Sequence, residues 1–188
     1  MIGTPAEIYF RNRGCAMPTG QDVRYGPNTW HWKARQHAPA ILCRVTDFVT
    51  GEPLTVHLTF ITEDGLKSPL IPRKLMLPGH QKQGGVVRLT DDADVTLCLG
   101  VAEGMETALT VMATGFGPVW AAIDAGNMAS LPVLPGIENL WIFADHDPAG
   151  IKAAHSLRDR WAAAGRDVFI SKPPQQGADW NDFDATIA

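Results

Sequence analysis

Two apolar runs in the second half of the chain each end abruptly on acidic residues. Residues 96–102 lead directly into Glu103, and residues 139–144 lead into Asp145 and Asp147. A short, continuous apolar run that passes into a helical pattern is typical of a strand buried in a parallel sheet. Functional groups of such sheets gather where the strands end. We therefore expect these three acids to meet at one edge of a sheet.

The remainder of the second half alternates helical and strand patterns. Helical patterns cover residues 105–115, 125–131 and 148–164, and apolar runs predict strands at 119–123 and 167–171. Strands separated by helices of this length imply right-handed crossovers and a largely parallel sheet. The sequence therefore predicts an α/β fold in which helices flank a largely parallel sheet.

The first half predicts a small α+β subdomain. Residues 4–14 have the pattern of a short helix, with Pro5 at its first position. Residues 40–47 and 54–61 alternate as strands do, and the turn-forming run 50–53 joins them. This pattern predicts a hairpin. In its second strand we expect one side to face the core (Val56, Leu58 and Phe60) and the other to face solvent (Thr55, His57 and Thr59).

An acidic, turn-prone run at residues 90–94 separates the two halves and gives predicted domains at 1–94 and 95–188. The formal net charge of −4 hides an asymmetry between them. Residues 1–95 carry 11 Lys and Arg against 9 Asp and Glu, whereas residues 96–188 carry 5 against 11. The chain between Gly65 and Thr90 has no acid and contains five basic residues, which are Lys67, Arg73, Lys74, Lys82 and Arg88. This local pattern is compatible with nucleic acid binding.

The spacing of the acids predicts a metal site. Asp145 and Asp147 are two residues apart, so in extended chain their side chains point the same way, and Glu103 arrives from another strand. Clustered carboxylates repel unless a proton or a cation joins them, and an all-oxygen set favours Mg²⁺ or Mn²⁺. An alternative remains open: Asp147 before a proline is also a good helix N-cap, and paired aspartates are common in turns. We expect Glu106, in the first helical turn, to be a solvated acid that complements the helix dipole.

Cysteine usage and hydropathy exclude several other classes of protein. Cys15, Cys43 and Cys98 are widely spaced, which argues against a zinc ribbon or a disulfide framework, so we expect no zinc. No apolar run approaches the roughly 20 residues of a membrane helix, and the N-terminus has no signal-peptide pattern. We therefore expect a soluble, cytoplasmic protein.

Several motifs together resemble the Toprim domain of primase-like proteins from phages, plasmids and other mobile elements. The motifs are residues 101–108, 125–127, 143–150 and 177–182. The resemblance implies a Toprim-type, Rossmann-like core in which Glu103 acts as general acid or base or orients the metal, while Asp145 and Asp147 bind it. It places Asp179 and Asp182 near a second metal. Gly104 and Asn127 lie in the matching motifs, and we assign them to nucleotide binding.

Residues 1–90 resemble, less distinctly, the region that precedes Toprim in these proteins. Residues 9–14 and 72–74 carry this likeness. In primases the matching subdomain helps to form a basic template track. The resemblance thus implies phosphate contacts for Arg73, Lys74, Lys82 and Arg88; a solvated basic face is the alternative.

The resemblance predicts a metal-dependent nucleotidyltransferase that makes primers on single-stranded nucleic acid from nucleoside triphosphates. A Toprim nuclease and a non-catalytic nucleic-acid-binding module are the alternatives. The chain has neither the zinc ribbon nor the helicase phosphate loop that many family members carry. It is therefore either a fragment of a longer protein or a reduced form, with a helicase or zinc-ribbon domain supplied elsewhere.

Overall fold

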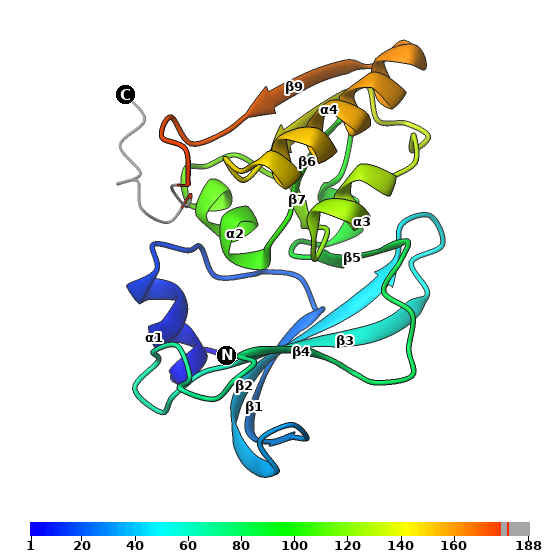
Figure 1. Ribbon diagram of the computed structural model, residues 1–188. Coiled ribbons are helices and arrows are strands. Elements are labelled where there is room, and N and C mark those ends of the chain that lie inside the picture. Colours follow the sequence, from blue (N-terminus) through cyan, green and yellow to red (C-terminus); the bar gives the residue numbers. More distant parts are fainter. Residues whose placement is uncertain (178–179, 181–188) are drawn as a thin grey trace.

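One mixed sheet runs through the computed structural model, which describes residues 1–177 and residue 180 (Figure 1). In that part of the chain nine strands pair, in the order β4-β3-β2-β5-β7-β6-β8-β9, and β1 pairs with β2. The helices are α1 (Pro5–Asn12), α2 (Met105–Ala113), α3 (Ala125–Ser130) and α4 (Pro148–Ala163), with a 3₁₀ turn at Asp92–Asp94.

The second half has the predicted α/β fold. Its strands are β6 (Cys98–Ala102), β7 (Val119–Ala121), β8 (Asn139–Phe143) and β9 (Asp167–Ser171). Strand β6 pairs in parallel with both β7 and β8, and β8 pairs in parallel with β9. Strands β6, β7 and β8 are largely apolar because both faces of the sheet are covered there, whereas β9 is an edge strand with exposed residues. Leu99 and Val101 pack on the α4 side, whereas Ala102 packs on the α2 side, so the two helices cover opposite faces.

The first half forms the predicted hairpin from β2 (Gln36–Asp47) and β3 (Pro53–Phe60), which pair antiparallel. Strands β1 (Val23–His31) and β4 (Lys74–Met76) extend it on either side. Helix α1 also forms as predicted. Its Tyr9 and Phe10 are buried in the same apolar cluster as Met105 and Leu109 of α2, so α1 lies against the α/β half.

The expectation that one side of β3 faces solvent is wrong. Leu58 and Phe60 are buried as predicted, but Thr55 and Thr59, on the other side, are also buried. Helices from distant parts of the sequence cover that second side, because the cluster beneath it joins Cys43 and Val45 of β2 to Met105 of α2. Alternation within a strand reports which residues share a side, but tertiary packing decides whether a polar side is covered.

Strand β5 (Gly85–Arg88) joins the two halves into one sheet. Its first residues pair with Thr46 and Asp47 of β2, and its last residues pair with Trp120 and Ala121 of β7, both antiparallel. The two predicted domains therefore share a sheet, and the boundary at 94/95 stays a prediction. Within the described residues no helix is long and apolar enough to cross a membrane.

Candidate functional site

Four acids lie where three neighbouring parallel strands end, and we call these residues the acid edge: Glu103, Asp124, Asp145 and Asp147. Glu103 follows β6, Asp124 lies after β7, and the other two follow β8. Strand β6 lies between β7 and β8, so the loops that carry the acids leave the sheet side by side. The sequence indicated three of these residues. Asp124 escaped notice because it precedes a short helix, where aspartate is an ordinary cap.

The Glu103 carboxyl group has a raised pKa. Burial raises its pKa, and the negative charges of Asp145, Asp147 and Asp124 raise it further, to about 7. The Asp145 backbone acts in the opposite direction but does not offset these effects. The Glu103 Oε1 atom is buried and has no hydrogen-bond partner in the described structure. An acid poised near neutrality with an unsatisfied oxygen is a candidate for proton transfer or cation binding.

Gly150 makes room for this carboxylate. A Cβ atom at position 150 would lie 2.5 Å from Glu103 Oε1 and 2.6 Å from the Asp145 carbonyl oxygen. No ordinary side chain fits there, so a glycine in the first turn of α4 allows the Glu103 carboxylate to approach the chain that follows β8. The sequence pattern alone would explain this glycine only as part of a turn.

The structure confirms the helix-cap interpretation of Asp147, and its metal-binding role stays a prediction. Asp147 is exposed and caps α4, with its Oδ1 accepting a 2.8 Å hydrogen bond from the Gly150 amide. Among residues 1–177 and 180, no three His, Cys, Asp or Glu side chains converge as a metal site does. The donor chemistry nevertheless fits Mg²⁺ or Mn²⁺, since the acid edge offers only carboxylates and the Glu103 oxygen lacks a partner. Asp179 and Asp182 lie outside the described residues.

Lys82 brings the basic stretch of the first half to the acid edge. Its Nζ lies 2.5 Å from Asp124 Oδ2, while Asp124 Oδ1 accepts a hydrogen bond from the backbone N–H of Asn127 at 2.8 Å. Burial raises the pKa of Asp124, but the Lys82 and backbone interactions outweigh burial and leave that pKa below its usual value. A hollow of about 690 Å³ opens here, between the loop that carries Lys82 and the start of α3.

The two residues assigned to nucleotide binding, Asn127 and Gly104, have different structural environments. The buried side-chain amide of Asn127 donates hydrogen bonds to the Gly85 and Ala122 carbonyl oxygens and accepts one from the Gly84 backbone N–H. These hydrogen bonds connect β5 to α3. Gly104 is the N-cap of α2, directly after Glu103. Nucleotide contacts by these two residues stay predictions, and the internal bonds of Asn127 give it a structural role.

Arg88 is a core residue. It is 8% exposed, and its guanidinium donates to Thr46 Oγ1 and to the carbonyl oxygens of Asp47 and Phe48. The same group lies 4.4 Å from the centre of the Trp120 ring. These partners occupy the guanidinium inside the sheet, so the burial of Arg88 gives no support to its predicted phosphate contact.

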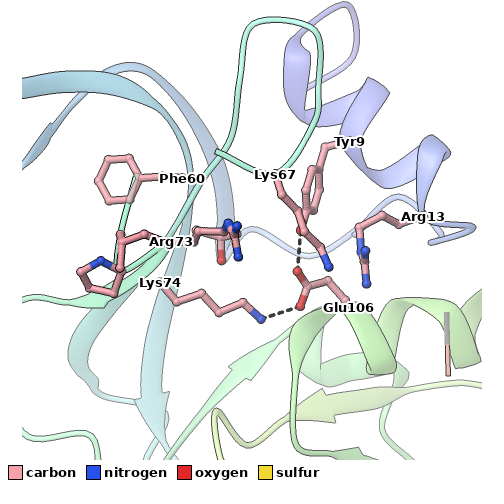
Figure 2. Close-up of a pocket in the computed structure, with 10 residues that line it drawn as sticks. Tyr9, Arg13, Phe60, Lys67, Arg73, Lys74 and Glu106 are labelled. Carbon is pink, nitrogen blue, oxygen red and sulfur yellow. Dashed lines mark hydrogen bonds and ion pairs between the residues drawn. The ribbon is translucent and has the colours of Figure 1, made fainter. Parts of the chain in front are cut away.

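A basic pocket of about 350 Å³ lies between α1, β3, the chain before β4, and α2 (Figure 2). Arg73 and Lys74, which the sequence indicated, line it together with two further cations, Arg13 and Lys67. Figure 2 shows these cationic side chains gathered around Glu106.

Glu106 is buried, so the expectation of a solvated acid is wrong. Its Oε1 accepts a 2.6 Å hydrogen bond from the Tyr9 hydroxyl, and its Oε2 lies 2.6 Å from Lys74 Nζ. Burial raises the pKa of Glu106, but Lys74 and Tyr9 outweigh burial and leave it lowered. Burial and the nearby carboxylate raise the pKa of Tyr9. No local signal could reveal this, because Tyr9 is 97 residues away in the chain.

Both halves of the chain match family models. Residues 98–186 match the Toprim domain, and residues 1–89 match a domain of unknown function, DUF7146. The family match thus assigns residues 98–186, which carry the acid edge of the second half, to the Toprim class. The second half of this chain is a Toprim domain. No curated protein matches the sequence significantly.

Solved primase structures share the fold. The DnaG catalytic core superposes with a TM-score of 0.61 at 16% identity, over 96% of this chain and 68% of that one. The Aquifex aeolicus primase, with zinc-binding and RNA polymerase domains, gives 0.56 at 17% identity, over 95% and 51%. The Mycobacterium tuberculosis DnaG RNA polymerase domain in complex with double-stranded DNA gives 0.51 at 17% identity, over 95% and 56%. The chain therefore spans between 51% and 68% of the length of these three structures.

Proposed function

We propose that this chain is the catalytic core of a metal-dependent, primase-type nucleotidyltransferase that acts on single-stranded nucleic acid. The observation that carries the proposal is the acid edge, where Glu103, Asp145 and Asp147 end neighbouring strands of a Toprim sheet beside the cationic first half. The similarity to primase cores in fold supports it. The joining of nucleotides in this protein, rather than cleavage, is our inference.

In this proposal Asp145 and Asp147 hold Mg²⁺, with Glu103 beside them. When bound, the cation orients phosphate oxygens and stabilises the charge that develops on them during transfer. Glu103 accepts the proton of the attacking 3′-hydroxyl. In the metal-free protein burial and the neighbouring acids raise the pKa of Glu103 to about 7, and a cation held by Asp145 and Asp147 would favour the deprotonated form that a base requires.

Cations of the first half bind the phosphates in this proposal. Lys82 is half-exposed beside the acid edge and borders the 690 Å³ hollow, so it contacts the nucleoside triphosphate. Arg73 and Lys74 are exposed on the side of α2 and contact phosphate groups of the nucleic acid or nucleotide. Each contact adds an electrostatic attraction that salt weakens.

The test is incorporation of labelled nucleotides on a single-stranded template with Mg²⁺ or Mn²⁺. The key variant is Asp145→Asn/Asp147→Asn, since asparagine removes both charges and can still cap α4. The matched control is Asp159→Asn, an exposed acid of the same helix. We expect labelled oligomers from the wild-type chain and the control, and none from the double variant. Shortened template without extension, or no product with either metal, would contradict the proposal.

A further inference from the structure

The basic pocket carries a surplus of positive charge that the acid edge does not use. Apart from Arg13, three cations line it, namely Lys67, Arg73 and Lys74, and among the described lining residues the carboxylate is that of Glu106. Lys74 and the Tyr9 hydroxyl already neutralise and solvate that carboxylate. Arg73 uses its Nε to donate to the Ser68 carbonyl oxygen, and within the described chain Lys67 forms no ion pair. The pocket therefore attracts a further anion.

A threonine with an unsatisfied hydroxyl also lines this pocket. Thr59 lines the pocket, is only 3% exposed, and its Oγ1 has no hydrogen-bond partner in the described structure. A buried hydroxyl without a partner is costly, and native proteins rarely leave one. An oxygen atom of a bound ligand would satisfy it. Phe60 and Pro72 form an apolar part of the pocket lining beside the cations.

The charge balance selects the kind of anion. A phosphodiester inside a strand carries one negative charge, whereas a terminal phosphate carries between about −1.5 and −2 at pH 7 and offers three oxygens. Cations that converge from several elements on one point suit such a compact group better than an extended backbone (Figure 2). Because Glu103 lies only three residues before Glu106 of α2, this group would lie close to the acid edge.

We propose that the basic pocket binds the terminal phosphate of a nucleotide or of a nucleic acid 5′ end, and that it does so without a metal. The inference rests on the proposed function in one respect: it takes the phosphate to be that of a nucleotide or a nucleic acid. It does not depend on catalysis, so the two proposals can fail separately.

The experiment measures binding of two oligothymidylates that differ only in their 5′ end, phosphate or hydroxyl, by fluorescence anisotropy of a 3′ label. The full chain is used in EDTA, which removes divalent cations. We expect the 5′-phosphorylated strand to bind about 10-fold more tightly, since charge-assisted hydrogen bonds give discrimination of that order. Lys67→Ala/Arg73→Ala should reduce the preference to about 2-fold or less. Lys152→Ala/Arg158→Ala removes the same charge from α4, on the opposite face, and should preserve it.

Two further variants separate the explanations. Asp145→Asn/Asp147→Asn should keep the 5′-phosphate preference even if it abolishes nucleotide incorporation. Thr59→Val, which removes the hydroxyl and little volume, should weaken the preference. Competition with AMP then identifies the source: displacement at concentrations near its own Kd indicates a free nucleotide, and no displacement indicates a strand end. Equal binding of the two strands, or a preference that survives Lys67→Ala/Arg73→Ala, would overturn the proposal.

Discussion

Glu103 and Gly150 form the tightest steric relationship of the acid edge. A methyl group at position 150 would overlap the Glu103 carboxylate and the Asp145 carbonyl oxygen, at 2.5 and 2.6 Å. Gly150→Ala must therefore displace one of them. Because errors of about 1 Å in a catalytic group cost on the order of 100-fold in rate, we expect nucleotide incorporation to fall at least 10-fold.

The control for this variant is Ala149→Ser, which adds one atom at the exposed neighbouring position. It should keep the wild-type rate. A Gly150→Ala protein that incorporates nucleotides as fast as this control would show that the position of Glu103 is unimportant.

The raised pKa of Glu103 predicts how metal-free stability depends on pH. The group titrates near 4.5 when unfolded and at about 7 when folded, so the folded state binds more protons between these values. Stability therefore falls as pH rises through that window, by about 1–2 kcal/mol once solvent screening of a half-buried group is allowed for. Glu103→Gln removes this penalty.

Urea unfolding in EDTA at pH 5 and pH 8 measures the effect. Glu103→Gln should raise the free energy of unfolding clearly at pH 8 and little at pH 5. Glu138→Gln, an exposed acid elsewhere in the Toprim half, should show no such difference. An equal gain at both pH values for Glu103→Gln would contradict the assigned pKa.

At the scale of elements, helix α2 is held to the first half through Glu106. Glu106→Gln keeps the shape of the side chain but loses the charge that faces Lys74 and Tyr9. Because Lys74 is half-exposed, its ion pair is partly screened, and we expect a loss of about 1–2 kcal/mol in unfolding free energy.

Urea unfolding at pH 7 tests this, with Glu7→Gln as the comparison. Glu7 pairs with the exposed Arg11 within α1, and such pairs contribute about 0.5 kcal/mol or less. If the two variants lose the same stability, Glu106 is not the fastening between α2 and the first half.

The elements that could be predicted from sequence are those whose signal is local. Strands β6 and β8 are continuous apolar runs, and α4 has an N-cap, a first-turn proline and a glycine stop. Strand β1 was missed because Gly26 interrupts it, where its register with β2 shifts. Strand β5 is only four residues long and exists because β2 and β7 flank it. Glu103, Asp145 and Asp147 could be predicted for the same reason as β6 and β8, whereas Asp124 and Glu106 gain their roles from distant partners.

At the scale of the whole molecule, three further kinds of contact tie the halves together, besides the Glu106 bonds and the shared apolar cluster. Backbone pairing through β5 makes the sheet continuous, the Asn127 amide binds Gly84 and Gly85, and Lys82 meets Asp124. All three position the cations of the first half against the acids of the second. The charge asymmetry of the sequence indicated a basic first half and an acidic second half, but only long-range strand pairing places these charges side by side.

This continuity predicts cooperative unfolding of the entire chain. Removing residues 1–94 would take β5 away from β7 and expose the apolar side of α2 that packs against Phe10 and Cys43. An exposed edge strand and an uncovered core are both unfavourable. Far-UV circular dichroism and tryptophan fluorescence should therefore report one coincident urea transition for residues 1–188, and a fragment of residues 95–188 should lack a cooperative transition. Two separated transitions, with a stably folded fragment, would instead support a boundary at 94/95 between domains that fold independently.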